Sequence, residues 1–270
     1  MVRANLPSPS AGLGPNLTPN TLLNFINAKG NILLALTSET PVSTSIVSLL
    51  AELDISLPVE RTGLVVDHFN YDASSASELH DVLLVPPPKA ARSGLKDFFG
   101  AGAKSDELLA LPRTVGTTLG AGELLNPIVR APRTAYSYSP KEQAETVDDV
   151  FAAGEQLALV GTMQARNSGR FTVMGSAEAL QDKWFGAKVK TVEGKAATTF
   201  NREFARRLSG WTFHETGVLR VNWIEHHLNE AGAANQSNPT IYRVNNQVVS
   251  SLLSRHLQRI QIPMRDPVAY

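Results

Sequence analysis

The chain has 270 residues, of which 43 % are apolar, and this is enough for one large domain with a packed core. Lysine plus arginine and aspartate plus glutamate number 25 each, and the resulting formal charge of zero argues against a nucleic-acid-binding protein, which would need a basic face. The absence of cysteine excludes disulfides, thiolate metal sites and a cysteine nucleophile.

The N-terminal part predicts two helix–strand units. Residues 1–18 are rich in Pro, Ser, Gly and Asn, which is typical of a tail or loop. A helix is predicted next, with Thr18 as its N-cap, Pro19 in its first turn and Gly30 as its stop. The apolar run "NILLALTS" is typical of a buried parallel strand. The helical pattern "STSIVSLLAELDI" and the strand "GLVVDH" repeat the unit.

The middle of the chain continues the alternation of strands and helices. "HDVLLVPP" predicts a strand, and residues 86–112, rich in Pro, Gly, Ala and Lys, are predicted to form a long loop. "LNPIVRAPRTAYSYSP" indicates one or two exposed strands. "EQLALVGTMQARNSGRFTVMGS" predicts strand, polar loop and strand, "FNREFARRLSGWTFHE" an amphipathic helix, and "GVLRVNWIEHHLNE" another strand.

We therefore predict an open, mostly parallel α/β sheet over residues 19–231. The first helix has no strand before it, which suggests that the sheet is incomplete at its N-terminus. Residues 232–270 are predicted to be a linker and a poorly structured tail that contains one weak helical run, "VVSSLLSRHLQRI".

A polar cluster follows the strand at residues 64–66. Asp67, His68, Asn70 and Asp72 lie within six positions, and ligands bind beyond the carboxyl ends of strands in open α/β sheets. A histidine beside a carboxylate is suited to act as an oriented base, and the same groups are suited to hold a metal. The alternative is structural, with Asp67 capping backbone amides, Asn70 and Asp72 forming a turn, and Phe69 and Tyr71 packing.

A second polar loop, "QARNSGR", is expected at an equivalent edge of the sheet. Arg166, Asn167 and Arg170 are suited to clamp an anion or sugar hydroxyls, or else they form a polar turn whose arginines pair with carboxylates. His226 and His227 are adjacent on a predicted strand and so face opposite sides, which favours surface histidines over a shared metal site.

The remaining motifs are incomplete. The glycine-rich stretches at Gly100 and Gly120 complete neither a dinucleotide-binding nor a phosphate-binding loop, and there is no G-x-S-x-G elbow. We therefore assign no catalytic residue, no metal ligand and no cofactor. Asn16 and Asn235 fit the N-glycosylation acceptor pattern.

Six segments resemble the Wbp-type (48-kilodalton) non-catalytic subunit of the eukaryotic oligosaccharyltransferase, and its fungal branch most closely. They occur in the family's order, and they are "GLGPNLTPNTLLNFINAKGNILLA", "LLAELDISLPVERTGLVVDHFNYD", "HDVLLVP", "NPIVRAPRTAYSYSPKE", "MQARNSGRFTVMGS" with "DKWF", and "NREFARRLSGWTFHETGVLRVNWIEHHLNE".

The resemblance implies a lumenal α/β domain of the flavodoxin or glutamine-amidotransferase type in a membrane protein of the endoplasmic reticulum. The complex transfers a preassembled high-mannose oligosaccharide from dolichyl diphosphate to asparagine in Asn-X-Ser/Thr. A multi-spanning subunit carries the catalysis, and the Wbp-type subunit supports assembly beside ribophorin-like and small membrane subunits.

Relative to the family, we expect this chain to be truncated at both ends. The N-terminus has no apolar signal-peptide core, and no stretch reaches the roughly 18 to 20 apolar residues of a membrane span, whereas the family anchors through a C-terminal helix. Two other functions remain open. One is an amidotransferase-like or hydrolase-like enzyme that uses Asp67 and His68, and the other is a module that binds glycans or lipid head groups through Arg166, Asn167 and Arg170.

Overall fold

The computed structural model describes residues 17–59, 61–89, 95–138, 150–229 and 238–257. They belong to two compact units, unit 1 up to Thr212 and unit 2 from Phe213 onward. The helices are α1 (Pro19–Asn27), α2 (Thr44–Glu52), α3 (Leu95–Gly100) and α4 (Asn201–Thr212), with short 3-10 helices η1 (Gly154–Gln156), η2 (Glu178–Leu180) and η3 (Asp182–Trp184). The strands are β1 (Ile32–Ala35), β2 (Ile55–Ser56), β3 (Leu64–Val66), β4 (Val82–Val85), β5 (Glu107–Pro112), β6 (Thr118–Leu119), β7 (Leu125–Arg130), β8 (Tyr136–Tyr138), β9 (Ala158–Gln164), β10 (Arg170–Met174), β11 (Lys188–Lys190), β12 (Ala196–Thr199), β13 (Val218–Leu228) and β14 (Val248–Leu257).

Unit 1 is a mixed α/β structure with several sheets. Two of them have four strands, in the orders β1-β10-β9-β7 and β11-β12-β5-β4, and β2 pairs with β6 and β3 with β8. Among the described strands, β1–β10 and β12–β5 pair in parallel and the other pairs are antiparallel. The prediction of a mostly parallel sheet is therefore wrong for this part of the chain.

The antiparallel pair β9–β10 follows from the short connection between its strands. The turn between β9 and β10 closes with a hydrogen bond from the Ala165 amide to the Gly169 carbonyl at 2.8 Å, and Ser168 adopts a left-handed backbone with φ of 76°. A connection this short permits only antiparallel pairing. Both strands are buried along most of their length, so they have the continuous apolar pattern that is also typical of parallel strands.

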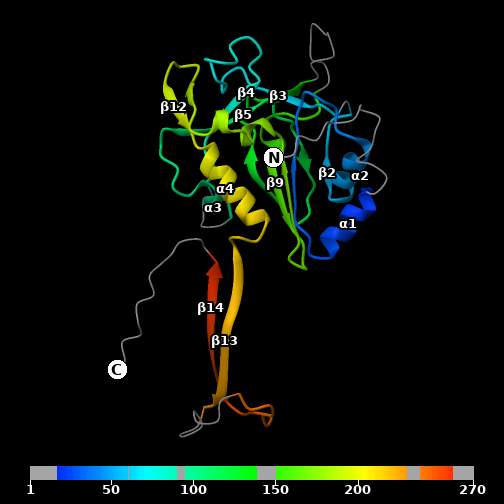
Figure 1. Ribbon diagram of the computed structural model, residues 1–270, viewed down its shortest axis with the longest axis vertical. Helices are drawn as coiled ribbons and strands as arrows, with labels where there is room; N and C mark the ends of the chain where they lie inside the picture. Colours follow the sequence, from blue (N-terminus) through cyan, green and yellow to red (C-terminus); the bar gives the residue numbers. More distant parts are fainter. Residues whose placement is uncertain (1–16, 60, 90–94, 139–149, 230–237, 258–270) are drawn as a thin grey trace. The chain divides into compact units, whose positions relative to one another are not determined.

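The four-stranded sheet that contains β10 separates two layers of helices, with α3 and α4 on one side of β9 and α1 and α2 on the other (Figure 1). Phe171 and Val173 of β10 belong to the apolar cluster that includes residues of α1 and α2. Thr172, between them, points the opposite way, and its hydroxyl lies 2.6 Å from that of Thr212 at the end of α4. This alternation places an apolar core on each face of the sheet.

Local sequence signals explain the helices of unit 1. The Thr18 hydroxyl accepts a hydrogen bond from the Thr21 amide at 3.1 Å, and Pro19 occupies the first turn of α1, as predicted. In α4, Phe204, Leu208 and Trp211 lie on the buried face and pack in the core cluster that also contains residues of β5 and β9.

Residues 86–112, predicted to form a long loop, contain α3 and β5 instead. Leu109 and Leu111 of β5 are fully buried, and β5 lies between β12 and β4. Of the residues that suggested a loop, Pro86, Pro87, Pro88 and Lys89 follow β4, and Gly102 and Lys104 connect α3 to β5, whereas Lys96 and Gly100 belong to α3.

Unit 2 contains the antiparallel pair β13–β14, with Leu228 opposite Val248. The α/β domain was expected to run to residue 231, but the first unit ends at Thr212 because β13 pairs with β14. The described part of the weak helical run in the predicted tail, Val248–Leu257, is the strand β14. Val248 and Val249 favour extended backbone, and the hydrogen-bonded pairing with β13 stabilises a strand here rather than the predicted helix. No helix among the described residues is long and apolar enough to cross a membrane.

Candidate functional site

Asp67 lies directly after β3 and is fully buried. One carboxylate oxygen accepts hydrogen bonds from the backbone amides of Phe69 at 2.8 Å and Asn70 at 3.1 Å. The Thr134 hydroxyl donates to the same carboxylate at 2.8 Å, and the Asn70 side-chain amide does so at 3.0 Å. The bonds from the Phe69 and Asn70 amides are the capping role considered for Asp67, and the bond from Thr134 also fixes the loop after β3 to the segment before β8.

Asp72 closes the other end of this loop and is also buried. It accepts hydrogen bonds from the Lys190 amide at 2.8 Å, the Ser74 hydroxyl at 2.7 Å and the Ser75 hydroxyl at 2.5 Å. Burial alone would raise the pKa of Asp72, but these hydrogen bonds outweigh it and hold the pKa below its ordinary value. Asp72 is thus an ionised anchor between the loop and β11.

His68 belongs to a cluster of rings that we call the histidine–tyrosine cluster, formed by His68, Tyr71, His80 and Tyr136. The Nδ1 atoms of His68 and His80 are 2.5 Å apart, and His68 Nε2 is 3.0 Å from the Tyr136 hydroxyl. The rings of Tyr71 and His80 stack with centroids 4.0 Å apart, whereas the predicted packing of Phe69 is wrong, because its side chain is 69% exposed. His80 was not among the predicted site residues, although it directly precedes the apolar run that forms β4.

The second predicted group lies elsewhere in unit 1. Asn167 donates from its side-chain amide to the Ile26 and Asn27 carbonyls, at 3.0 and 2.8 Å, and so holds the end of α1. Figure 1 places α1 and β3 at opposite ends of unit 1. The expected equivalent edge is therefore wrong, because this turn belongs to the sheet β1-β10-β9-β7, whereas β3 pairs with β8.

The two arginines of this turn differ in their surroundings. Arg166 is exposed, whereas Arg170 is buried, with its guanidinium 4.4 Å from the centroid of the Trp211 ring. Arg170 also donates to the Gln164 side chain at 3.1 Å and to the Trp211 carbonyl. Burial lowers the pKa of Arg170 to about 10. Its described contacts join β10 to α4, which is a packing role.

The remaining candidates are separate from these clusters. In unit 2, His226 Nδ1 lies 2.5 Å from the Tyr242 hydroxyl, and His227 Nδ1 lies 2.8 Å from the Leu228 carbonyl oxygen. Asn16 and Asn235 lie outside the described residues. Within the described ranges, no group of three or more His, Asp or Glu side chains is placed to hold a metal ion.

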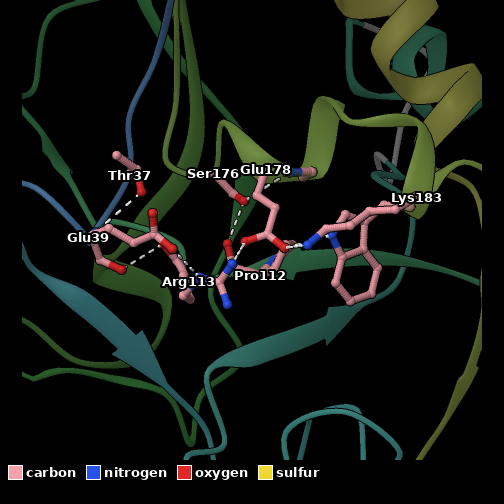
Figure 2. A network of polar contacts seen from close by, with 10 residues as sticks. Thr37, Glu39, Pro112, Arg113, Ser176, Glu178 and Lys183 are labelled. Atoms are coloured by element: carbon pink, nitrogen blue, oxygen red, sulfur yellow. Dashed lines mark hydrogen bonds and ion pairs between the residues drawn. The ribbon is translucent and has the colours of Figure 1, made fainter. Parts of the chain in front are cut away.

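A polar network that sequence reasoning did not identify surrounds Glu178 at the start of η2. Figure 2 shows its carboxylate between Arg113 and Lys183, each of which forms an ion pair with it. The Trp184 indole also donates to it at 3.1 Å, and Arg113 Nε lies 3.0 Å from a carboxylate oxygen of Glu39. Glu39 and Arg113 are distant in sequence from the stretch that contains Glu178, Lys183 and Trp184, so no local spacing predicts the whole network.

Comparison with known proteins was made on the sequence and on the structure. The sequence profile described as "OST48, N-terminal domain" matches residues 5–215. The Caenorhabditis elegans "Dolichyl-diphosphooligosaccharide--protein glycosyltransferase 48 kDa subunit" is 33% identical over 217 residues, which cover 79% of this chain and 47% of that protein. The Schizosaccharomyces pombe "Dolichyl-diphosphooligosaccharide--protein glycosyltransferase subunit wbp1" is 30% identical over 251 residues, which cover 92% of this chain and 52% of that protein. The chain thus spans about half the length of the curated relatives it matches.

Among solved structures, one described as "mmIFT52 N-terminal domain" has a TM-score of 0.45 and 14% sequence identity, and the match covers 72% of this chain and 69% of that one. The sequence comparisons, and not this structural likeness, are the basis for assigning a family.

Proposed function

Because the chain belongs to the OST48 family, we propose that it acts as a non-catalytic subunit of the oligosaccharyltransferase complex. The complex transfers a preassembled high-mannose oligosaccharide from dolichyl diphosphate to asparagine in Asn-X-Ser/Thr of nascent proteins. The observation that carries the proposal is the match of the family profile to residues 5–215. The work of this subunit is assembly and stability of the complex, through contacts between protein surfaces.

The hydrogen bonds of the carboxylates after β3 support an accessory role over the alternative of an enzyme. A general base needs a carboxylate or imidazole that can reach a substrate proton. Asp67 is fully buried and accepts hydrogen bonds from Phe69, Asn70 and Thr134, and Asp72 accepts them from its own loop and from β11. Both carboxylates therefore serve the fold of the loop.

The partners in this proposal are the multi-spanning catalytic subunit and the ribophorin-like and small membrane subunits. Its place is the lumenal side of the endoplasmic reticulum membrane, where Asn16 and Asn235 would meet the glycosylation machinery as predicted acceptors. The flavodoxin- or amidotransferase-like type of the sheet belongs to the same proposal. Helix layers on both faces of the sheet that contains β10 support it, whereas the antiparallel pairs β10–β9 and β9–β7 depart from it.

Affinity capture tests this proposal directly. The tagged full-length gene product is expressed in its own cells, solubilised in mild detergent and captured, and the co-purifying proteins are quantified by mass spectrometry. We expect the catalytic subunit in near-equal amount to the bait. A bait that is recovered folded and membrane-associated, but without the catalytic subunit, contradicts the proposal. An unrelated tagged lumenal protein is the control.

A further inference from the structure

The histidine–tyrosine cluster brings two imidazole nitrogens together. His68 lies two residues after β3, and His80 lies two residues before β4, so the two histidines come from opposite ends of one loop. Their Nδ1 atoms are 2.5 Å apart, and their ring planes are nearly perpendicular at 84°. Each ring therefore aims a nitrogen at the other rather than stacking on it.

Neighbouring groups hold both rings in this orientation. The Tyr136 hydroxyl lies 3.0 Å from His68 Nε2, and when it accepts the proton of Nε2 it leaves Nδ1 with a free lone pair. Tyr71 stacks on the His80 ring. The backbone at His80 is left-handed, with φ of 52°, and it is held by hydrogen bonds from its amide to the Ala76 carbonyl and from the Asp67 amide to its carbonyl.

Two neutral imidazoles can approach nitrogen to nitrogen only if one donates a proton and the other accepts it. A metal ion satisfies both lone pairs at once, because neutral imidazole nitrogen is a common ligand for zinc, copper and nickel. We propose that His68 and His80 form a binding site for a divalent transition-metal ion of this class. Nothing in the family assignment requires such a site.

The geometry requires a small adjustment on binding. Zinc binds imidazole nitrogen at about 2.0–2.1 Å with tetrahedral angles, so the two Nδ1 atoms must separate to about 3.3 Å. The His68 side chain is exposed and can therefore make this shift. Water completes the coordination, because no third His, Asp or Glu ligand is placed beside the pair in the described part of the chain. The site is therefore an open one with two protein ligands.

Zinc titration of the purified full-length protein, followed by calorimetry at pH 7.5, tests the proposal. We expect saturable binding of one ion per chain at the pair. His68→Gln and His80→Asn should each weaken binding at least about 10-fold, because each removes one of the two ligands. Asparagine is chosen at position 80 because it tolerates the left-handed backbone. Far-UV circular dichroism checks that each variant is folded, and His68→Gln decides alone if the other is not.

Three comparisons make the result specific. His227→Ala, which removes a histidine of unit 2, should bind zinc like the parent protein. Magnesium should give no saturable binding, because it prefers oxygen ligands. Lowering the pH to 5.5 should weaken zinc binding, because imidazole must be neutral to bind a metal. Equal affinity in His68→Gln and the parent, loss of binding in His227→Ala alone, or no saturable binding to the parent would each overturn the proposal.

Discussion

Asp67 shows at the scale of one residue how a side chain suited to catalysis serves the fold instead. Its carboxylate is fully buried and accepts hydrogen bonds from the Phe69 and Asn70 amides and the Thr134 hydroxyl. A buried acceptor of this kind stabilises the folded state mainly because its loss would leave the donors unpaired. The residue types in the sequence allowed both roles, and the hydrogen-bond partners decide between them.

Replacement of Asp67 by alanine should lower the free energy of unfolding by about 2–4 kcal/mol, because several buried donors lose their acceptor together. Urea denaturation, monitored by circular dichroism, measures the change. Asp106→Ala, at an exposed turn position, is the matched control and should change stability by less than about 0.5 kcal/mol. A loss equal to that of the control would show that the Asp67 contacts do not hold the loop.

At the scale of elements, the Glu178 network joins η2 and η3 to the end of β5 (Figure 2). Burial alone would raise the pKa of Glu178, but the hydrogen bonds from Lys183 and Trp184 and the charge of Arg113 outweigh it and lower the pKa. A carboxyl group whose pKa is lower in the folded state stabilises the fold above its unfolded-state pKa. This stabilisation is lost as the pH falls through the folded-state value.

Replacing Glu178 with glutamine should therefore lower the free energy of unfolding by about 1–2 kcal/mol at pH 7. This loss lies between the losses typical of breaking an exposed and a buried ion pair. The difference in unfolding free energy between the variant and the parent should shrink as the pH falls below the ordinary glutamate pKa of 4.5. Denaturation curves across pH 3 to 7 measure both effects. Glu39→Gln, which removes only an exposed partner of Arg113, should stay within about 0.5 kcal/mol of the parent. A Glu178→Gln deficit that does not depend on pH would contradict the assignment.

The elements also show what the sequence predicts and where prediction fails. Continuous apolar runs correctly indicated β1, β3, β4, β9 and β10, and helical spacing indicated α1, α2 and α4, because local burial fixes these patterns. Pairing direction, β5 and β14 were missed, since they depend on partners that are distant in sequence. In the site, the sequence predicts the capping of backbone amides by Asp67 as one of two alternatives. His80 was missed, since only the tertiary fold brings it to His68.

At the scale of the whole molecule, unit 1 contains the described residues that match the OST48 profile up to Thr212. Its helix-covered sheet has polar loops that are held by internal hydrogen bonds. In the proposed accessory role, such a domain contributes a rigid surface to a larger assembly rather than a reaction centre. Unit 2 carries exposed apolar side chains on its strand pair, among them Trp223 and Ile224. A strand pair of this kind is marginally stable in water unless other surfaces cover it.

The central claim is that this protein supports N-glycosylation without performing the transfer. Depletion of the full-length gene product in its own cells, followed by gel analysis of a secreted reporter with several Asn-X-Ser/Thr sites, tests it most directly. We expect the reporter to lose glycans at a fraction of its sites, and re-expression of the parent to restore them. A fully glycosylated reporter in depleted cells would contradict the account.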